Sequence, residues 1–280
     1  MRESVILLGS DGFVGKKLAK GLGKDIKIYC FDREKSASNS GQNNIHKKKS
    51  IEKLVNNDLP ESKYFVINLV AKLGSADYSE NFRDNVLTVR NLISLVNNDK
   101  NCKGIIHFSS ISAERRISAY GRTKALGEKF IRIFCKRPYM ILRSEMIIGE
   151  GARSTEKLKK ASTILPFITF LPKGGKVRRY PVNIEEVVNI VRDILVHKTF
   201  KNETFLLCAD KDSTIREMVR NYTNNIIIPV PGALLVFFGR ILELIYAKPW
   251  FTKDNAVGLI SDTNSACRKL TVSSLSSILK

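Results

Sequence analysis

The chain has 280 residues, of which 43% are hydrophobic and 26% charged, a composition typical of a folded globular protein rather than a disordered one. Lysine and arginine number 47 against 27 acidic residues, which gives a formal net charge of +20. The basic residues lie in scattered short groups such as Arg115-Arg116 and Arg178-Arg179, without a nucleic-acid-binding motif, so nucleic-acid binding is not expected as the main function.

Short apolar runs alternate with segments of helical spacing along the first half of the chain. The apolar runs predict strands at Val5–Leu8, Ile26–Phe31, Tyr64–Val70, Ile105–Phe108 and Tyr139–Leu142. The intervening segments predict helices at Phe13–Leu22, Phe82–Val96 and Tyr120–Phe134. Continuous apolar runs are typical of parallel strands that are covered on both faces. The order therefore predicts an α/β fold with a doubly wound parallel sheet, similar to the Rossmann fold.

Two parts of the chain fit this alternation less well. The stretch 34–57 is polar, although a third strand and its crossover helix are expected there. After residue 143, glycine and proline interrupt the pattern. We therefore expect a dinucleotide-binding domain in residues 1–143, followed in residues 144–280 by late sheet elements and a small substrate-binding lobe.

The first predicted strand runs directly into the sequence GSDGFVG at Gly9 to Gly15. A glycine turn between a strand and a helix lets a phosphate approach both the backbone and the helix N-terminus. The turn predicts binding of the pyrophosphate of NAD or NADP, with Gly9, Asp11, Gly12, Phe13 and Val14 beside the cofactor. A carboxylate aimed at the pyrophosphate would repel it, so Asp11 is expected to point away and cap the helix.

The second predicted strand is followed by Asp32 and Arg33. Asp32 stands at the separation from the glycine turn at which a carboxylate receives the two hydroxyls of the adenosine ribose, which favours NAD. Arg33 is suited to pairing with a 2′-phosphate, so NADP stays open.

Tyr120 and Lys124 are four residues apart and therefore share one face of a predicted helix. A tyrosine in this position exchanges a proton with a substrate oxygen while nicotinamide exchanges a hydride. Lys124 is expected to lower the pKa of the phenol and to hold the nicotinamide ribose. The preceding strand ends in several serines, of which Ser110 is favoured to hydrogen-bond the reacting oxygen, with Ser112 and Ser109 as alternatives.

These motifs resemble those of the short-chain dehydrogenase/reductase superfamily, in particular its extended branch of NAD-dependent epimerases and dehydratases. The resemblance rests on GSDGFVG at Gly9 to Gly15, Asp32, NLVA at Asn68 to Ala71, NVLTVRNL at Asn85 to Leu92, FSS at Phe108 to Ser110, YGRTK at Tyr120 to Lys124, and LRSEMIIGEG at Leu142 to Gly151. It implies tightly held NAD and, for many members, a nucleotide-linked sugar as substrate.

The same resemblance implies roles for individual residues. Ser110, Tyr120 and Lys124 correspond to the catalytic group, and Tyr120 and Lys124 also lie at the cofactor. The wall beside the cofactor is assigned to three consecutive residues, Leu69, Val70 and Ala71. Asn85 is expected to support the active site from the following helix. The resemblance also implies a homodimer that pairs through the helices predicted at 82–96 and 120–134.

Some features depart from the extended branch. The interval between Ser110 and Tyr120 is shorter than in many sugar-nucleotide enzymes, and Arg143-Ser144 stands where an Arg-Pro pair is usual. Three segments, SAYGRTKALGEK, LPFITFLPKGGKVRRYPVNIEEVV and KPWFTKDNAVGLISD, resemble an atypical branch that includes an accessory subunit of respiratory complex I. Two functions therefore stay open: an NAD(P)-dependent epimerase, dehydratase or reductase of a nucleotide-activated sugar, or a nucleotide-binding structural or assembly protein.

The remaining sequence features concern metals, disulfides and membranes. The five cysteines are far apart and the three histidines follow no ligand spacing, so neither a disulfide framework nor a metal site is expected, and a reducing cytoplasm fits best. No signal peptide is visible. The most apolar stretch, Ile226 to Ala247, contains Pro229, Pro231, Arg240 and Glu243, which favours a buried or amphipathic helix over a membrane span, with peripheral membrane contact as an alternative.

Overall fold

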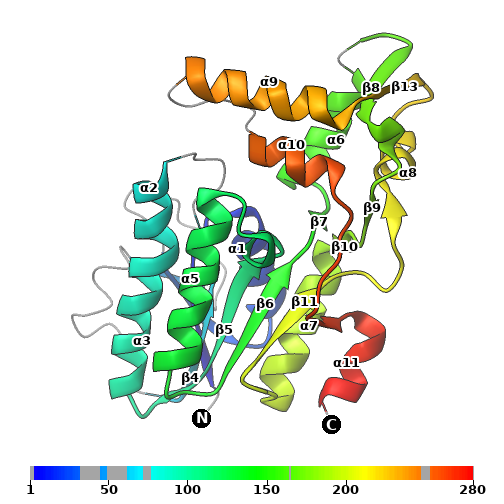
Figure 1. Ribbon diagram of the computed structural model, residues 1–280. Helices are drawn as coiled ribbons and strands as arrows, with labels where there is room; N and C mark the ends of the chain where they lie inside the picture. Colours follow the sequence, from blue (N-terminus) through cyan, green and yellow to red (C-terminus); the bar gives the residue numbers. More distant parts are fainter. Residues whose placement is uncertain are drawn as a thin grey trace.

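The computed structural model of the protein describes residues 3–31, 45–48, 62–71, 77–163, 165–246 and 253–279. Within these residues the centre is an eight-stranded sheet whose neighbouring strands are all parallel (Figure 1). The strand order is β14-β11-β6-β5-β4-β1-β2-β3. The strands are β1 (Ser4–Leu8), β2 (Lys27–Phe31), β3 (Ile45–Lys48), β4 (Tyr64–Asn68), β5 (Cys102–Ser110), β6 (Tyr139–Ser144), β11 (Glu203–Leu207) and β14 (Arg268–Leu270).

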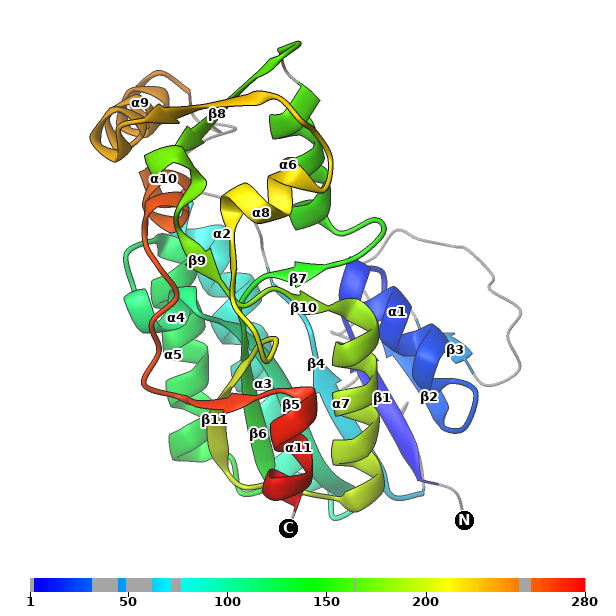
Figure 2. The ribbon, with the colours of Figure 1, turned by 90° about the vertical axis from the view of Figure 1, so that its right-hand side faces the viewer.

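Helices cover both faces of this sheet (Figure 2). One face carries α1 (Phe13–Leu22), α7 (Ile184–His197) and α11 (Val272–Leu279), and the other carries α2 (Tyr78–Phe82), the π-helical turn η2 (Arg83–Leu87), α3 (Thr88–Asn98) and α5 (Ala119–Phe134). Successive side chains of a strand point to opposite faces. In β1, Val5 and Leu7 enter one apolar core, whereas Ile6 and Leu8 enter the other. This arrangement explains why the strand is apolar throughout, and it confirms the doubly wound fold.

The elements predicted for the first half of the chain are present, with shifted ends. The helix predicted at 82–96 begins earlier, as α2, and continues through η2 and α3. A third strand exists inside the polar stretch 34–57, where β3 pairs with β2. The helix expected in the apolar stretch 226–247 is α9 (Gly232–Ile245), which follows β13 (Ile226–Val230). Most of its side chains are exposed, so of the two expected alternatives, a buried or an amphipathic helix, the buried one is wrong.

A smaller lobe lies beyond the carboxyl edge of the sheet. Its own apolar core is formed by Leu158, Leu171, Val177, Ile215, Met218 and Val219. The short helix α4 (Ser112–Arg115) connects β5 to α5 along the chain. The remaining elements of the described chain are β7 (Ile147–Ile148), α6 (Arg153–Thr163), β8 (Ile168–Pro172), η3 (Lys173–Gly175), β9 (Arg178–Arg179), β10 (Val182–Asn183), β12 (Ser213–Thr214), α8 (Ile215–Arg220), β13, α9 and α10 (Lys253–Ile260). No helix in the described part of the chain combines the length and the apolarity that a membrane crossing requires.

Candidate active site

A cavity of about 690 Å³ separates the carboxyl edge of the sheet from the lobe. The sheet side of its lining comes from the turn after β1, the residues after β4, and the ends of β5 and β6. The lobe side comes from α6, α8 and α10, and α5 closes a third side. Ligands of doubly wound folds bind at this edge of the sheet, so the cavity is the candidate active site.

Two glycines of the turn are required by the packing of the protein itself. Gly9 has φ +82°, and a Cβ there would lie 3.2 Å from the backbone carbon of Leu69. A Cβ on Gly15 would lie only 2.3 Å from the carbonyl oxygen of Gly9 and 2.7 Å from the Cα of Ser10. Neither position therefore accepts a side chain without movement of the backbone.

Gly12 differs, because the fold itself leaves room for a side chain there. Its φ is −67°, and a Cβ would meet only the carbonyl oxygen of Gly9, at an ordinary contact distance of 3.4 Å. Gly12 lines the cavity and is the N-cap residue of α1, whose first turn contains no acidic residue. The space in front of the helix N-terminus thus stays open, next to N–H groups without intrahelical partners, which fits a bound pyrophosphate.

The other residues predicted to contact the cofactor divide into four groups. Phe13, Val14, Leu69 and Ala71 line the cavity. Val70 is buried behind this surface, and its carbonyl oxygen accepts a hydrogen bond from Nζ of Lys124 at 3.4 Å. Asp11 is outside the cavity lining, and the N-cap position of α1 belongs to the next residue, Gly12, so the expectation that the Asp11 side chain caps this helix stays a prediction. Asp32 and Arg33 lie outside the described residues, so their ribose contacts stay a prediction.

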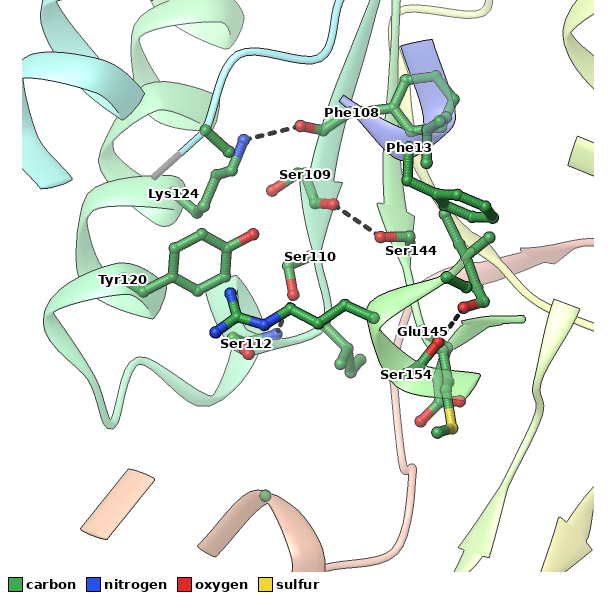
Figure 3. A pocket seen from close by; sticks show the side chains of 18 of the residues that line it. Phe13, Phe108, Ser109, Ser110, Ser112, Tyr120, Lys124, Ser144, Glu145 and Ser154 are labelled. Atoms are coloured by element: carbon green, nitrogen blue, oxygen red, sulfur yellow. Dashed lines mark hydrogen bonds between the residues drawn. The ribbon is translucent and has the colours of Figure 1, made fainter. Parts of the chain in front are cut away.

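Ser110, Tyr120 and Lys124 line the same cavity, and Figure 3 shows the hydroxyl of Tyr120 pointing toward Ser110. Tyr120 stands in the first turn of α5, where Oγ of Ser118 accepts a hydrogen bond from the backbone N–H of Gly121 at 2.8 Å and so fixes the start of the helix. Burial raises the pKa of Tyr120 to about 12, and a hydrogen bond with Ser110 partly opposes that rise.

Lys124 does not lower the pKa of the phenol as expected. Its side chain is buried, and Nζ donates to the carbonyl oxygens of Phe108, at 2.9 Å, and Val70. Burial lowers the pKa of Lys124 to about 8, while the negative charge of Glu128 acts in the opposite direction. The expectation is wrong because burial dominates the pKa of Tyr120 and the ammonium group is directed at backbone carbonyls.

Hydrogen bonds of the neighbouring serines favour Ser110 over Ser109, whereas Ser112 also lines the cavity and stays an alternative. Oγ of Ser109 donates to Oε1 of Glu128 at 2.6 Å, so this hydroxyl is held away from the phenol. The backbone N–H of Ser112 donates to Oγ of Ser110 at 3.2 Å. That hydrogen bond orients the Ser110 hydroxyl at the end of β5.

Asn85 supports the site from η2 rather than lining it. Its Nδ2 donates to Oγ1 of Thr123 at 3.0 Å, inside the core between η2 and α5. Thr123 lies directly before Lys124, so this contact helps to hold the turn of α5 that presents Tyr120 and Lys124 to the cavity.

Glu128 is a site-supporting residue that the sequence analysis missed. It is fully buried and accepts hydrogen bonds from Nη2 and Nε of Arg143, at 2.8 and 2.9 Å, and from Nη2 of Arg132 at 2.5 Å. The carboxylate raises the pKa of Arg143 above its usual range. Arg143 also donates to Oε2 of Glu114 at 3.1 Å. The sequence contains one indication that Glu128 lies near the site, because it follows Lys124 by four residues on the same face of α5.

Four basic side chains on the cavity wall were also missed: Arg115, Arg153, Lys157 and Arg179. Burial lowers the pKa of Arg115, and Arg179 lowers it further. Burial likewise lowers the pKa of Lys157, with Arg153 adding to the effect. Cations that depress one another's protonation in one cavity favour an anionic ligand there. In the sequence two of them are visible only as parts of scattered basic pairs, which do not indicate a shared site.

Comparison with known proteins agrees with this geometry. The model of the NAD-dependent epimerase/dehydratase family matches residues 5–205. Comparison with curated protein sequences gives no match. Among solved structures, Bordetella bronchiseptica WbmF in complex with NADH is similar with a TM-score of 0.69 and 18% identity, over 94% of this chain and 88% of that chain.

Two further solved structures are similar in fold. One is a UDP-N-acetylglucosamine 4-epimerase from Methanobrevibacter ruminantium in complex with UDP-N-acetylmuramic acid, with a TM-score of 0.64 and 19% identity over 82% of this chain and 85% of that chain. The other is a dTDP-glucose 4,6-dehydratase from Bacillus anthracis in complex with NAD, with a TM-score of 0.64 and 16% identity over 82% of this chain and 84% of that chain. At these identities the likeness concerns the fold.

Proposed function

Because this chain belongs to the NAD-dependent epimerase/dehydratase family, we propose that it is an enzyme that uses NAD to epimerise, dehydrate or reduce a nucleotide-activated sugar. One observation carries the proposal: a single cavity is lined by the glycine turn on one side and by Ser110, Tyr120 and Lys124 on another. A dinucleotide held by the turn and a proton-transfer group thus share one space.

Some residues of the site bind the cofactor, and others transfer a proton to or from the substrate. Gly12 and the N-terminus of α1 receive the pyrophosphate, and Leu69 and Ala71 form a wall beside the cofactor. NAD supplies the acceptance and return of a hydride when it is bound. The raised pKa of Tyr120 keeps its phenol protonated near neutral pH, so this hydroxyl is suited to giving a proton to a sugar carbonyl oxygen in the half of the reaction that returns the hydride. In the half that removes the hydride, the deprotonated oxygen of Tyr120 would take the proton of the sugar hydroxyl.

The remaining catalytic side chains position that proton transfer. The hydroxyl of Ser110 lies on the side to which the phenol points and donates to the same substrate oxygen, which keeps the oxygen in line with Tyr120. Lys124 is held by two backbone carbonyls and lines the same cavity, so its positive charge lies beside the space assigned to the cofactor. NADP is the alternative cofactor if Arg33 receives a 2′-phosphate.

The substrate class is supported by the charge of the cavity. Arg115, Arg153 and Lys157 form a basic wall that suits the diphosphate of a nucleotide sugar, whereas Arg179 is paired with Glu145, which also lines the cavity. The M. ruminantium structure holds UDP-N-acetylmuramic acid, and a UDP-glucose 4-epimerase from Thermotoga maritima with a TM-score of 0.63 and 17% identity holds UDP-glucose. Both support a nucleotide sugar as the ligand of this cavity.

The test begins with mass spectrometry of ligands released from the purified protein, where NAD is the expected product. The protein is then incubated with NAD and a panel of UDP- and dTDP-sugars, and conversion is followed by NMR. Tyr120→Phe should lower kcat by roughly 10²- to 10⁴-fold while the retained NAD is unchanged. Tyr222→Phe, at a tyrosine outside the cavity lining, serves as the matched control.

Two results would contradict the proposal in different ways. Equal turnover by Tyr120→Phe and the wild type would remove the proton-transfer role of this residue. Retained NAD without turnover of any sugar nucleotide would instead favour the nucleotide-binding structural function.

A further inference from the structure

Helix α9 presents an apolar face to solvent. Its exposed apolar residues follow the spacing of one helical stripe and are Leu234, Phe237, Phe238, Leu244 and Ile245. Phe237 is 61% exposed, Leu244 86% and Ile245 66%. The opposite side of the helix, with Gly239 and Leu242 buried, packs on α10. The orientation of the helix is thus fixed by the lobe, and its outward stripe is left open to a partner.

The length of α9 narrows the kind of partner. An apolar segment of about 10–14 residues is typical of a core helix or of a helix at a membrane interface, and a bilayer span needs about 20 residues. The helix has 14 residues, and its outward side chains are exposed rather than buried in the protein. Of the two alternatives, a core helix and a helix at a membrane interface, the exposed side chains therefore favour the interfacial one, with α9 parallel to a lipid surface.

The strands next to α9 add to the same surface. The β8–β13 ribbon lies with α9 at the end of the molecule opposite the two termini, in both Figure 1 and Figure 2. Exposed aromatic and aliphatic side chains belong to this ribbon and the turn before it: Phe167, Phe170 and Ile226, with exposed fractions of 79%, 51% and 68%. Exposed apolar groups on this scale mark an interaction surface rather than ordinary scatter.

The excess of basic residues on the lobe indicates which kind of surface α9 contacts. The described lobe elements α6, β8, η3, α8, β13, α9 and α10 contain nine Lys or Arg residues and four Asp or Glu residues. Lys159, Lys160, Arg220 and Arg240 are among the exposed ones. Exposed basic residues on the same lobe as an apolar helix face favour an anionic lipid surface, which attracts them electrostatically while the apolar side chains enter the headgroup region. A second copy of this chain is disfavoured, since both copies carry a net charge of +20.

We propose that α9 docks the protein on an anionic phospholipid bilayer, with Phe237, Leu244 and their neighbours on the stripe inserted at the headgroup level. The cavity lies next to α10, on which α9 packs: Val257, Gly258 and Leu259 of α10 line it. Docking through α9 therefore brings the lobe that covers the active site to the membrane surface. The inference does not depend on the reaction proposed above.

Co-sedimentation of the purified full chain with vesicles tests the proposal. One set of vesicles contains phosphatidylcholine alone, and the other contains phosphatidylcholine mixed with phosphatidylglycerol. We expect binding to the anionic vesicles, weaker binding at high salt, and little binding to phosphatidylcholine alone. The double variant Phe237→Gln and Leu244→Gln should reduce the partition coefficient by about tenfold or more, because each buried Phe or Leu side chain shifts a transfer equilibrium by about tenfold.

A matched control variant tests whether vesicle binding depends on the α9 stripe or on any exposed apolar side chain. Val196→Gln and Val272→Gln remove two apolar side chains of similar exposure, 61% and 51%, from α7 and α11, and this variant should bind like the wild type. Absence of binding to the anionic vesicles would overturn the proposal. So would equal binding by the α9 variant, which would mean that charge alone carries the attraction. Light scattering that shows a dimer lost in the α9 variant would assign the stripe to a second copy instead.

Discussion

Replacing Gly12 and Gly15 by alanine, one at a time, separates the two roles of the glycine turn. In Gly15→Ala the new methyl group would lie 2.3 Å from the carbonyl oxygen of Gly9 and 2.8 Å from that of Ser10. Both are backbone atoms that cannot rotate away, so relief requires displacement of the turn. Overpacking of this kind costs about 1–3 kcal/mol or more, and we expect a loss of about 3 kcal/mol in the free energy of unfolding.

Gly12→Ala should leave the stability of the protein nearly unchanged. The backbone at Gly12, with φ −67° and ψ 165°, is accessible to alanine, so the reduced freedom of the unfolded chain contributes about 0.4–1 kcal/mol. Alanine is a poorer N-cap than glycine by about the same amount, and the two effects nearly cancel. The methyl group enters the space assigned to the pyrophosphate, so NAD affinity should fall at least about tenfold through the loss of a charge-assisted hydrogen bond.

The two quantities are measured separately. Urea unfolding without nucleotide gives the stability of each variant, and isothermal titration calorimetry with NAD gives the affinity of Gly12→Ala. Unchanged NAD affinity in this variant would refute the assignment of the space before α1 to the cofactor. A stability loss as large as that of Gly15→Ala would show that the fold itself requires glycine at position 12.

Three further predictions follow from the buried and basic residues of the site. Lys124 has a pKa of about 8 in the folded protein and about 10.4 in the unfolded chain. Below pH 8 the buried side chain is charged, and the full cost of burying that charge destabilises the protein. As the pH rises from 8 to 10.4 the folded protein loses this proton before the unfolded chain does, so the destabilisation disappears. The difference in unfolding free energy between wild type and Lys124→Met should therefore change by about 3 kcal/mol between pH 7.5 and 10.5, and a constant difference would contradict the low pKa. Glu128→Ala leaves the buried guanidinium of Arg143 without its main partner and should cost about 3–5 kcal/mol in urea unfolding; a loss below about 1 kcal/mol would mean that Glu114 alone suffices. Arg153→Ala and Lys157→Ala should raise KM for the nucleotide sugar about tenfold with kcat and NAD affinity nearly unchanged, and an unaltered KM would place the diphosphate elsewhere.

The parts of the site that local sequence encodes were predictable. A strand followed by Gly9, Gly12 and Gly15 is recognisable because the turn geometry and the helix start depend on neighbouring residues only. The spacing of Tyr120 and Lys124 fixes their shared helix face in the same way. Both expectations place these residues in the cavity that the structure contains.

The parts that depend on tertiary packing were not predictable. Leu259 lines the cavity across from Tyr120, yet the two residues are far apart in the chain and no periodicity relates them. The pKa of Tyr120 was assigned the wrong direction, because the sequence gives the distance to Lys124 along the helix but not the depth of burial. The exposure of α9 was not predicted for the same reason. An apolar stretch of sequence indicates side chains whose burial is favourable, but only the fold determines whether other parts of the protein cover them.

The contrast between Glu128 and Lys124 distinguishes a structural charge from a functional one. Both are buried on one face of α5, one helical turn apart. Glu128 is neutralised by Arg143 and Arg132, so its burial is compensated within the protein. Lys124 donates to two carbonyl dipoles, and its lowered pKa records the remaining cost of its charge. A fold selected for stability alone has no use for an ammonium group in that position, whereas a site that binds a dinucleotide and transfers a proton does, and this makes Lys124 the clearest mark of function in the chain.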